Sequence, residues 1–407
     1  MTLRTLIFWP HLIAGVSAGA IILLMSVTGV LLTYERQMIA WSDSHYRSVQ
    51  PADGRPALSV ESLLATLRRE RPDLEISAVT LAADPAAPVS IAAGRQTLYA
   101  DAYTGRVLGE SSQGVRRVMS ELRAWHRWLA VEGDGRPLAR AITGWSNVLF
   151  LFIVASGIYL WFPRKWSWQH VRSVVMFAGG LRGKARDFNW HNVIGIWSAI
   201  PLFIVVLTAV PISFPWANAL VYRAVGEDPP PQGGRGGREG TPAAAGARAG
   251  GPRGGAQPAD GGVRPQPSDG LDALMASAAR QSPGWRTITV RVPASGRAPV
   301  VFAVDRGDGG QPQLRSTLSL DRATGAVVTS ESFSDQSLGR RLRSISRFAH
   351  TGEVLGLPGQ TIAGLATAGA VVLVWTGIAL ALRRLRAWIA RRRRHADSVD
   401  SRRVPAA

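Results

Sequence analysis

The sequence contains no cysteine among its 407 residues. Without thiols the chain forms no disulfide bonds, no thiolate metal sites and no Cys-ligated iron–sulfur clusters, and it cannot attach haem covalently through Cys-x-x-Cys-His. Any metal-containing cofactor must therefore be held by nitrogen or oxygen ligands.

Recognisable catalytic and nucleotide-binding motifs are also missing. No Gly-x-Gly-x-x-Gly, phosphate-binding loop, His-Glu-x-x-His or Gly-x-Ser-x-Gly segment occurs in a suitable context. We therefore expect no flavin or nucleotide site and no catalytic side chain, so any electrons must come from a partner or a diffusible donor.

Acidic residues are few: 28 Asp and Glu stand against 47 Lys and Arg, giving a net charge of +19. Such an excess can indicate nucleic-acid binding, but here much of it borders long apolar runs, in segments 163–189 and 383–407. The positive-inside rule predicts that both segments are cytoplasmic. We expect a lipid bilayer as the partner of this charge, and no nucleic acid.

Four apolar runs are long enough to cross a bilayer core, which needs roughly 20 residues. The first run is too long for a signal-peptide core and has no convincing cleavage site after it, which favours a retained anchor. The predicted spans are 8–34, 142–162, 190–214 and 361–382. With residues 1–7 and both basic segments in the cytoplasm, the connections 35–141 and 215–360 lie on the external side.

The chain reads as a duplication. The phrases "RRVMSELRAWH" and "RRLRSISRFAH" end at His126 and His350, and each follows a predicted hairpin with the pattern Asp-x-x-Thr-Gly. Each external region thus forms a small α+β module, 35–115 or 215–339, followed by an amphipathic segment, 116–141 or 340–360. Residues 226–268, rich in Gly, Pro, Ala and Arg, interrupt the second module and are predicted to be disordered.

The duplication also relates the spans. His11 and His191 open the first and third spans, each has glycine at i+4 (Gly15, Gly195), and each has threonine seventeen residues on (Thr28, Thr208). The second and fourth spans share "SGIYL" and "TGIAL". Pseudo-symmetry therefore predicts that His11 faces His191 near the inner surface, and that His126 faces His350 near the outer surface.

Opposed imidazoles inside a helix bundle suit haem iron, which takes one axial nitrogen from each side of the porphyrin. Gly15 and Gly195 lie one turn from their histidines, where a missing side chain lets the macrocycle approach. Two haems at two depths would divide a hydrocarbon core of about 30 Å into shorter electron transfers.

Simpler interpretations exist for each residue. A single histidine at a membrane edge is commonly a hydrogen-bonded interfacial residue, and Gly15 with Gly19 is also a helix-packing pattern. Most repeated arginines suit lipid headgroups, although Arg123 and Arg347, one turn from the histidines, are the best candidates for haem propionates. Trp125 and Trp190 belong to an interfacial belt or line a haem pocket. The remaining histidines lack counterparts and are predicted to be surface residues: His45, His170 and His395.

The chain resembles the PepSY-associated transmembrane helix proteins of bacteria. The resemblance rests on "WPHLIAGVSAGAIILLMSVTGVLLTYE", the two Asp-x-x-Thr-Gly hairpins, "WHRWL", "NWHNVIGIWSAIPLFIVVLTA" and "RFAHTGEVLGLPGQTIAGL". It covers nearly the whole chain except the Gly/Pro insertion. Members include inner-membrane ferric-siderophore reductases with two b-type haems in a four-helix bundle, so it implies axial roles for His11, His191, His126 and His350.

The sequence thus predicts a membrane four-helix bundle, built by duplication, with two small α+β PepSY-like periplasmic modules. The predicted function is bis-His dihaem electron transfer that reduces a ferric siderophore, with electrons from an unidentified cytoplasmic or quinone donor. The alternative is a non-redox PepSY membrane protein that binds or restrains peptidases or senses the envelope.

Overall fold

The computed structural model describes residues 2–162, 167–230, 270–292 and 298–400, with the side chains of residue 170 and residues 395–400 not described. Most of the segment predicted to be disordered, 226–268, lies outside these residues. The chain divides into two compact units. The helical unit comprises Met1–Met38, Gly114–Gly226 and Leu342–Ala407, and the sheet unit comprises Ile39–Gln113 and Glu227–Arg341.

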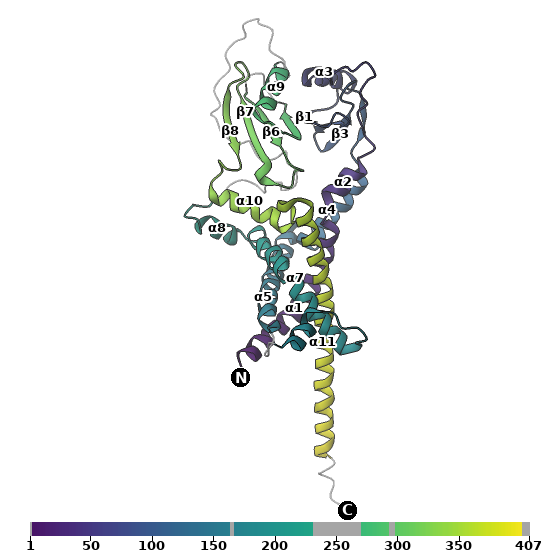
Figure 1. Cartoon of the computed structure of the whole chain (residues 1–407), viewed down its shortest axis with the longest axis vertical. Coiled ribbons are helices and arrows are strands. Elements are labelled where there is room, and N and C mark those ends of the chain that lie inside the picture. The colour runs from purple at the N-terminus through teal and green to yellow at the C-terminus, as the bar shows by residue number, and fades with distance from the viewer. Residues whose placement is uncertain (1, 163–166, 231–269, 293–297, 401–407) are drawn as a thin grey trace, which may run out of the picture. The chain divides into compact units, whose positions relative to one another are not determined.

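Four long apolar helices form the centre of the helical unit (Figure 1). They are α1 (Leu3–Leu32), α5 (Arg136–Trp161), α7 (Gly183–Ser213) and α11 (Gly356–Asp400). Each is long and apolar enough to cross a membrane, as the four predicted spans require. Helix α1 packs against α5 and α11, and α7 packs against the same two helices, so the four close into a bundle.

Small side chains dominate the contacts between these helices. Ala366 and Ala370 of α11 are buried against Leu202 of α7 and Val154 of α5. Gly19 of α1 faces Ile378 of α11, where a Cβ would lie 3.3 Å from the isoleucine Cδ1. Membrane helices associate through such close packing because lipid gives no hydrophobic force between them.

Helix α11 differs in length from the other three. The predicted span 361–382 and the predicted tail 383–407 belong largely to one helix, which runs to Asp400 and extends past the other long helices in Figure 1. Its last turns carry arginines and no apolar run, so α11 continues by helix propensity after the apolar part ends.

Shorter helices complete the helical unit at their described positions. Helix α4 (Gln113–Trp128) precedes the 3-10 turn η1 (Gly133–Gly135) and α5, and α10 (Leu338–His350) precedes η3 (Glu353–Leu355) and α11. The others are α2 (Glu35–Ser42), which begins in this unit, α6 (Trp168–Val175) and α8 (Pro215–Arg223). The predicted amphipathic segments are therefore helices α4 and α10, each leading into a long apolar helix.

The sheet unit contains one eight-stranded antiparallel sheet in the order β4-β3-β2-β1-β5-β6-β7-β8. Helix α3 (Val60–Glu70) precedes one half, and α9 (Leu271–Gln281) precedes the other. The strands are β1 (Ile76–Ala82), β2 (Val89–Ala93), β3 (Gln96–Ala100), β4 (Val107–Glu110), β5 (Thr287–Arg291), β6 (Val300–Asp305), β7 (Arg315–Leu320) and β8 (Val327–Ser332), with the 3-10 turn η2 (Pro312–Leu314) before β7.

The two predicted modules share this sheet. Strand β1 pairs with β5, so Val79 lies opposite Val290 and the two halves join edge to edge. Alternate residues point into a common core, where Leu64 of α3, Leu271 of α9 and Phe302 of β6 are all buried. The halves therefore form one folded body with one core.

The Asp-x-x-Thr-Gly patterns form the predicted hairpin turns. The Asp101 carboxylate accepts hydrogen bonds from the Thr104 backbone N–H at 2.8 Å and hydroxyl at 2.9 Å, and Asp321 accepts the same pair from Thr324, both at 2.8 Å. The glycine that follows each threonine has positive φ, +73° at Gly105 and +68° at Gly325, a conformation that glycine adopts without steric cost.

Candidate functional site: two pairs of histidines

Two of the four histidines selected by the duplication lie on the long helices themselves. The Nδ1 atom of His11, on α1, lies 2.8 Å from the Ser156 Oγ of α5. The Nδ1 atom of His191, on α7, lies 3.0 Å from the Thr376 Oγ1 of α11. The two imidazoles are near enough to interact electrostatically. The structure therefore brings His11 and His191 into one region, each fixed by a neighbouring helix.

The other two histidines lie on the shorter helices that precede spans. The Nδ1 atom of His126, on α4, is 3.0 Å from the Thr28 Oγ1 of α1. The Nδ1 atom of His350, on α10, donates to the Val205 carbonyl of α7 at 2.9 Å. Their rings face each other with centres 6.2 Å apart and planes inclined by 51°.

The hydrogen-bond partners determine which ring nitrogen carries the proton. The hydroxyls of Ser156, Thr376 and Thr28 each donate to a carbonyl four residues earlier on their own helix, at 2.6, 2.8 and 2.8 Å. Each hydroxyl oxygen must then accept from the histidine, and the Val205 carbonyl can only accept. In all four imidazoles this arrangement places the ring proton on Nδ1, which leaves the Nε2 lone pair available to a metal.

The separation of the outer rings agrees with a shared metal ion. An imidazole nitrogen lies about 1.1 Å from its ring centre and about 2.0 Å from a first-row metal that it binds, so two rings on opposite sides of one ion have centres about 6 Å apart. The observed 6.2 Å between His126 and His350 matches this value.

Burial keeps the outer histidines neutral. It lowers the pKa of His126 to about 4, and the neighbouring His350 adds to the effect. Burial also lowers the pKa of His350, against the opposing hydrogen bond to Val205. Neutral imidazole is the form that ligates metal, so these rings need lose no proton near neutral pH.

A glycine lies next to the imidazole ring of three of the four histidines. A Cβ on Gly157 would lie 3.4 Å from the His11 Cε1, one on Gly377 would lie 3.4 Å from the His191 Cε1, and one on Gly29 would lie 3.4 Å from the His126 Cε1. Each glycine directly follows the hydroxyl residue that binds the same ring. The pair of hydroxyl and glycine therefore makes one side of each of these three histidine sites.

Other predicted site residues have different surroundings. No atom approaches within 4 Å of a Cβ built on Gly15, and one on Gly195 would meet only the Leu373 side chain at 3.7 Å. Trp190 stacks edge-on with Phe177 and lies under the Arg186 guanidinium. Trp190 and Trp125 are exposed to a similar extent, 40% and 44%.

The two predicted propionate-binding arginines also have partners within the chain. Arg123 forms an ion pair with Glu35, and the exposed Arg347 lies over the Phe348 ring at 5.8 Å. His45 is exposed and contacts the Ser42 carbonyl and the Tyr46 ring. The side chains of His170 and His395 lie outside the described residues.

Sequence reasoning did not assign the hydroxyl–glycine pairs. Ser156-Gly157 and Thr376-Gly377 are the first two residues of the repeated "SGIYL" and "TGIAL", and Thr28-Gly29 belongs to "VTGV". The repeats themselves were the signal, but their role depends on knowing which helices are neighbours. In the described part of the chain no group of three or more His, Cys, Asp or Glu side chains surrounds a metal position. The protein donors at each site are thus two imidazoles.

The sequence profile of the PepSY-associated TM region matches residues 8–384. The chain belongs to this family. The match includes α5, α7, most of α1, the first part of α11 and both histidine pairs of this PepSY-associated protein, so its membrane-spanning character rests on both the family and the helices. A comparison with curated proteins found no match.

Proposed function

We propose that this PepSY-associated protein is a dihaem electron-transfer protein that reduces a ferric siderophore outside the bacterial inner membrane. The observation that carries the proposal is that Nδ1 of all four paired imidazoles is hydrogen-bonded to another helix, an arrangement that leaves Nε2 for a metal. Such anchoring of the second ring nitrogen is the usual accompaniment of histidine ligation.

The donor set fits two b-type haems. Two imidazoles at a site leave four coordination positions to another ligand, which is the number that a porphyrin supplies, and two axial histidines favour electron transfer over oxygen binding. His11 and His191 would hold the inner group, and His126 and His350 the outer one. When bound, each iron accepts and returns one electron, and the protein supplies ligation, spacing and electrostatics.

The distribution of charge supports the orientation. Basic residues between α5 and α7 and along the end of α11 border the apolar helices, and by the positive-inside rule this distribution supports a cytoplasmic location for both chain termini. His11 and His191 then lie towards the cytoplasm, and His126 and His350 towards the periplasm. Electrons enter from a cytoplasmic or quinone donor at the inner pair.

The substrate assignment rests on the family resemblance. Each half of the eight-stranded sheet is a helix followed by four strands, and in this proposal the two halves are the two PepSY-like modules on the periplasmic side. In this proposal siderophore-bound Fe(III) is the substrate: His126 and His350 would hold the haem that supplies one electron to it, and the resulting Fe(II) would be released for iron acquisition.

Visible absorption of the purified protein tests this proposal. Protein produced with ample iron and porphyrin should show the Soret and split α/β bands of low-spin haem. Addition of ferric siderophore to the reduced protein should reoxidise the haem and return the spectrum of the oxidised form. His191→Ala should remove about half of the haem absorbance, because one of two bis-His sites loses an axial ligand. His45→Ala, which changes an exposed histidine, should leave the spectrum unchanged.

A colourless preparation would overturn the proposal and favour the non-redox alternative, in which the protein binds or restrains peptidases or senses the envelope. An unchanged spectrum in His191→Ala would instead overturn the assignment of the inner pair.

A further inference from the structure

The outer histidines raise a mechanical question that the inner ones do not. His11 and His191 are on the long packed helices, whereas His126 and His350 are near the ends of α4 and α10, which precede the spans. Two imidazoles can share a metal only if their rings stay about 6 Å apart. Something must therefore hold α4 and α10 at the observed separation.

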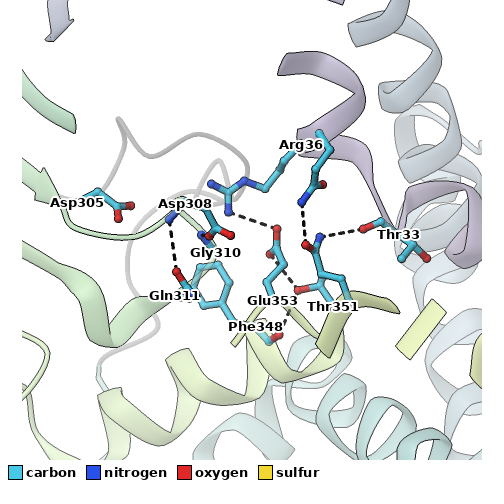
Figure 2. A network of polar contacts seen from close by, with 12 residues as sticks. Thr33, Arg36, Asp305, Asp308, Gly310, Gln311, Phe348, Thr351 and Glu353 are labelled. Carbon is cyan, nitrogen blue, oxygen red and sulfur yellow. Dashed lines mark hydrogen bonds and ion pairs between the residues drawn. The ribbon is translucent and has the colours of Figure 1, made fainter. Parts of the chain in front are cut away.

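Two adjacent residues at the start of α2 connect to both histidine-bearing segments. Glu35 forms an ion pair with Arg123, which is three residues before His126 on α4. Arg36 forms an ion pair with Glu353, three residues after His350, with 3.3 Å between Nη1 and Oε1. Figure 2 shows Arg36 reaching from α2 to this glutamate. We call Glu35 and Arg36 the α2 clamp.

Glu353, the partner of Arg36, also has a second contact, which is made within its own segment. Its Oε2 accepts a hydrogen bond from the Thr351 hydroxyl at 3.0 Å, and Thr351 directly follows His350 (Figure 2). The Glu353 side chain is 14% exposed, so water screens this pair less than it screens a surface ion pair. The Arg36–Glu353 pair is therefore connected to the end of α10 through Thr351, the residue that follows His350.

The neighbouring residues of α2 attach the clamp to the bundle. Gln37 donates to the Gln360 side chain of α11 at 2.8 Å, and Gln360, which is buried, donates to the Thr33 carbonyl at 3.0 Å. The Tyr34 hydroxyl lies 2.7 Å from the Thr361 hydroxyl. The segment that carries the clamp thus follows α1 directly in the chain and is hydrogen-bonded through side chains to α11.

We propose that Glu35 and Arg36 are positioning residues that set the spacing of His126 and His350 by holding α4 and α10 to one point at the start of α2. The proposal deepens the dihaem function, on which its spectroscopic test rests, but the spacing itself is measurable without haem. It also gives Arg123 a role that differs from propionate binding, because its guanidinium is held by a carboxylate of the same chain.

A distance measurement between α4 and α10 tests the clamp directly. Ser120 and Ser344 occupy equivalent places in the two repeated phrases, and the chain has no cysteine, so Ser120→Cys with Ser344→Cys gives two unique sites for nitroxide labels. Pulsed electron paramagnetic resonance on the full-length protein should give one narrow distance distribution. Glu35→Gln with Arg36→Gln should broaden this distance distribution. Each lost ion pair raises the population in which α4 or α10 is detached from α2 by up to about fivefold.

Carbon monoxide supplies the second measurement, on the haem-loaded protein. A firmly held bis-His iron excludes carbon monoxide, so the wild type should bind little after reduction. In the clamp variant the carbon monoxide-bound fraction should rise as the outer rings separate and should stop at half of the haem, because both ion pairs of the clamp are made with the segments that carry the outer histidines. A change that affects both haems equally would indicate general loosening and would overturn the positioning role.

Charge exchange separates positioning from simple loss of stability. Glu35→Arg with Arg123→Glu, combined with Arg36→Glu and Glu353→Arg, restores both ion pairs with reversed polarity and should return the narrow label distances and the resistance to carbon monoxide. Asp73→Asn removes the exposed Arg71–Asp73 ion pair of the sheet unit and should change neither measurement.

The outcomes separate the two proposals. If Glu35→Gln with Arg36→Gln leaves the label distances unchanged, the clamp is wrong whether or not haem is present. If the protein binds no haem but the distances broaden, the dihaem function is wrong and the clamp stands.

Discussion

The inner and outer histidine pairs use one chemical arrangement on two different supports. At the inner pair both ligand helices and both acceptor helices belong to the bundle: α1 and α7 carry the rings, and α5 and α11 carry the hydroxyls. At the outer pair α4 and α10 carry the rings, and only the acceptors, on α1 and α7, belong to long helices. Bundle packing positions the inner pair, and the Asp187–Arg383 ion pair joins α7 to α11 one turn before His191, whereas the outer rings lie on shorter helices outside the four long ones.

The difference indicates what ion pairs add at the outer histidines. Within a bilayer a buried ion pair is costly, so close packing of Gly, Ala, Ser and Thr is the available means of fixing a ring. At the membrane edge charged side chains are tolerated, and the α2 clamp uses them. The outer rings, with centres 6.2 Å apart, are thus supported by ion pairs as well as by hydrogen bonds, while the inner rings lie on packed helices.

The largest expected effect on the comparison of the inner and outer pairs is a steric loss of haem from the inner pair. Gly15 lies one turn from His11, and among the described residues no other part of the chain comes within 4 Å of its Cβ position, so Gly15→Leu should fold like the wild type. If the inner haem lies over this glycine, as the sequence predicts, the variant loses about half of the Soret absorbance, because the leucine occupies the position of the macrocycle. Absorption and melting in detergent measure the two effects separately.

Val16→Leu is the matched control, because Val16 is the exposed neighbour of Gly15 and adds similar bulk towards lipid. Unchanged haem content in Gly15→Leu would show that Gly15 serves no cofactor, which leaves Gly157 and Gly377 as the inner glycines that matter.

The hydroxyl acceptors give the next largest effect and compare the two depths directly. Thr376→Val at the inner pair and Thr28→Val at the outer pair keep the side-chain shape but remove the oxygen that accepts from Nδ1. Loss of such a partner commonly lowers metal affinity by about 10–100-fold. We expect the lower end, because the backbone of Leu373 or Met25 also hydrogen-bonds to the ring. Haem dissociation rates, followed by transfer to an apo-globin acceptor, measure this.

Thr208→Val is the control within the duplication. Thr208 is equivalent to Thr28 in sequence, yet its hydroxyl donates to the Ile204 carbonyl at 2.6 Å, and His350 is bound by the Val205 carbonyl instead. The variant should release haem at the wild-type rate. Faster release would mean that the hydroxyl does take part at His350.

The sequence predicted which histidines meet but not how they are held. The repeats identified His126 and His350 as equivalents, because duplication preserves the place of a residue in the fold. They could not identify the Glu35–Arg123 pair, because its members are far apart in the chain and, although Arg347 repeats Arg123, no acidic residue repeats Glu35. For the same reason, alternating strand patterns predicted two modules, while the pairing of β1 with β5 depends on contacts between the halves.

Local rules failed where the tertiary structure outweighs them. Pro10, Pro201 and Pro211 lie inside α1 and α7, although proline removes a helical hydrogen bond. Leu129 and Ala130, in the turn from α4 to α5, have φ of +53° and +55°, a conformation usually taken by glycine. No sequence pattern announces either exception, because surrounding contacts offset their costs.

The smallest expected effect concerns the turns that join the outer ligand helices to their spans. After His350 the chain uses Gly352, with φ +75°, and a Cβ there would overlap the Gly359 carbonyl oxygen. After His126 the chain uses Ala130 in a similar left-handed conformation. Because such strain costs an alanine about 1 kcal/mol and glycine loses part of that gain to chain entropy, Ala130→Gly should stabilise the helical unit by about 0.5 kcal/mol.

Gly352→Ala is the opposite change at the equivalent turn and should destabilise by more than about 1 kcal/mol, since it adds both the strained φ and the overlap. Unfolding in mixed micelles measures both variants. If Ala130→Gly also raises the carbon monoxide-bound fraction, the strained turn helps to direct His126 towards His350, and the outer pair is then held by backbone conformation as well as by charge. If it raises stability alone, the clamp and Thr28 suffice to position the ring.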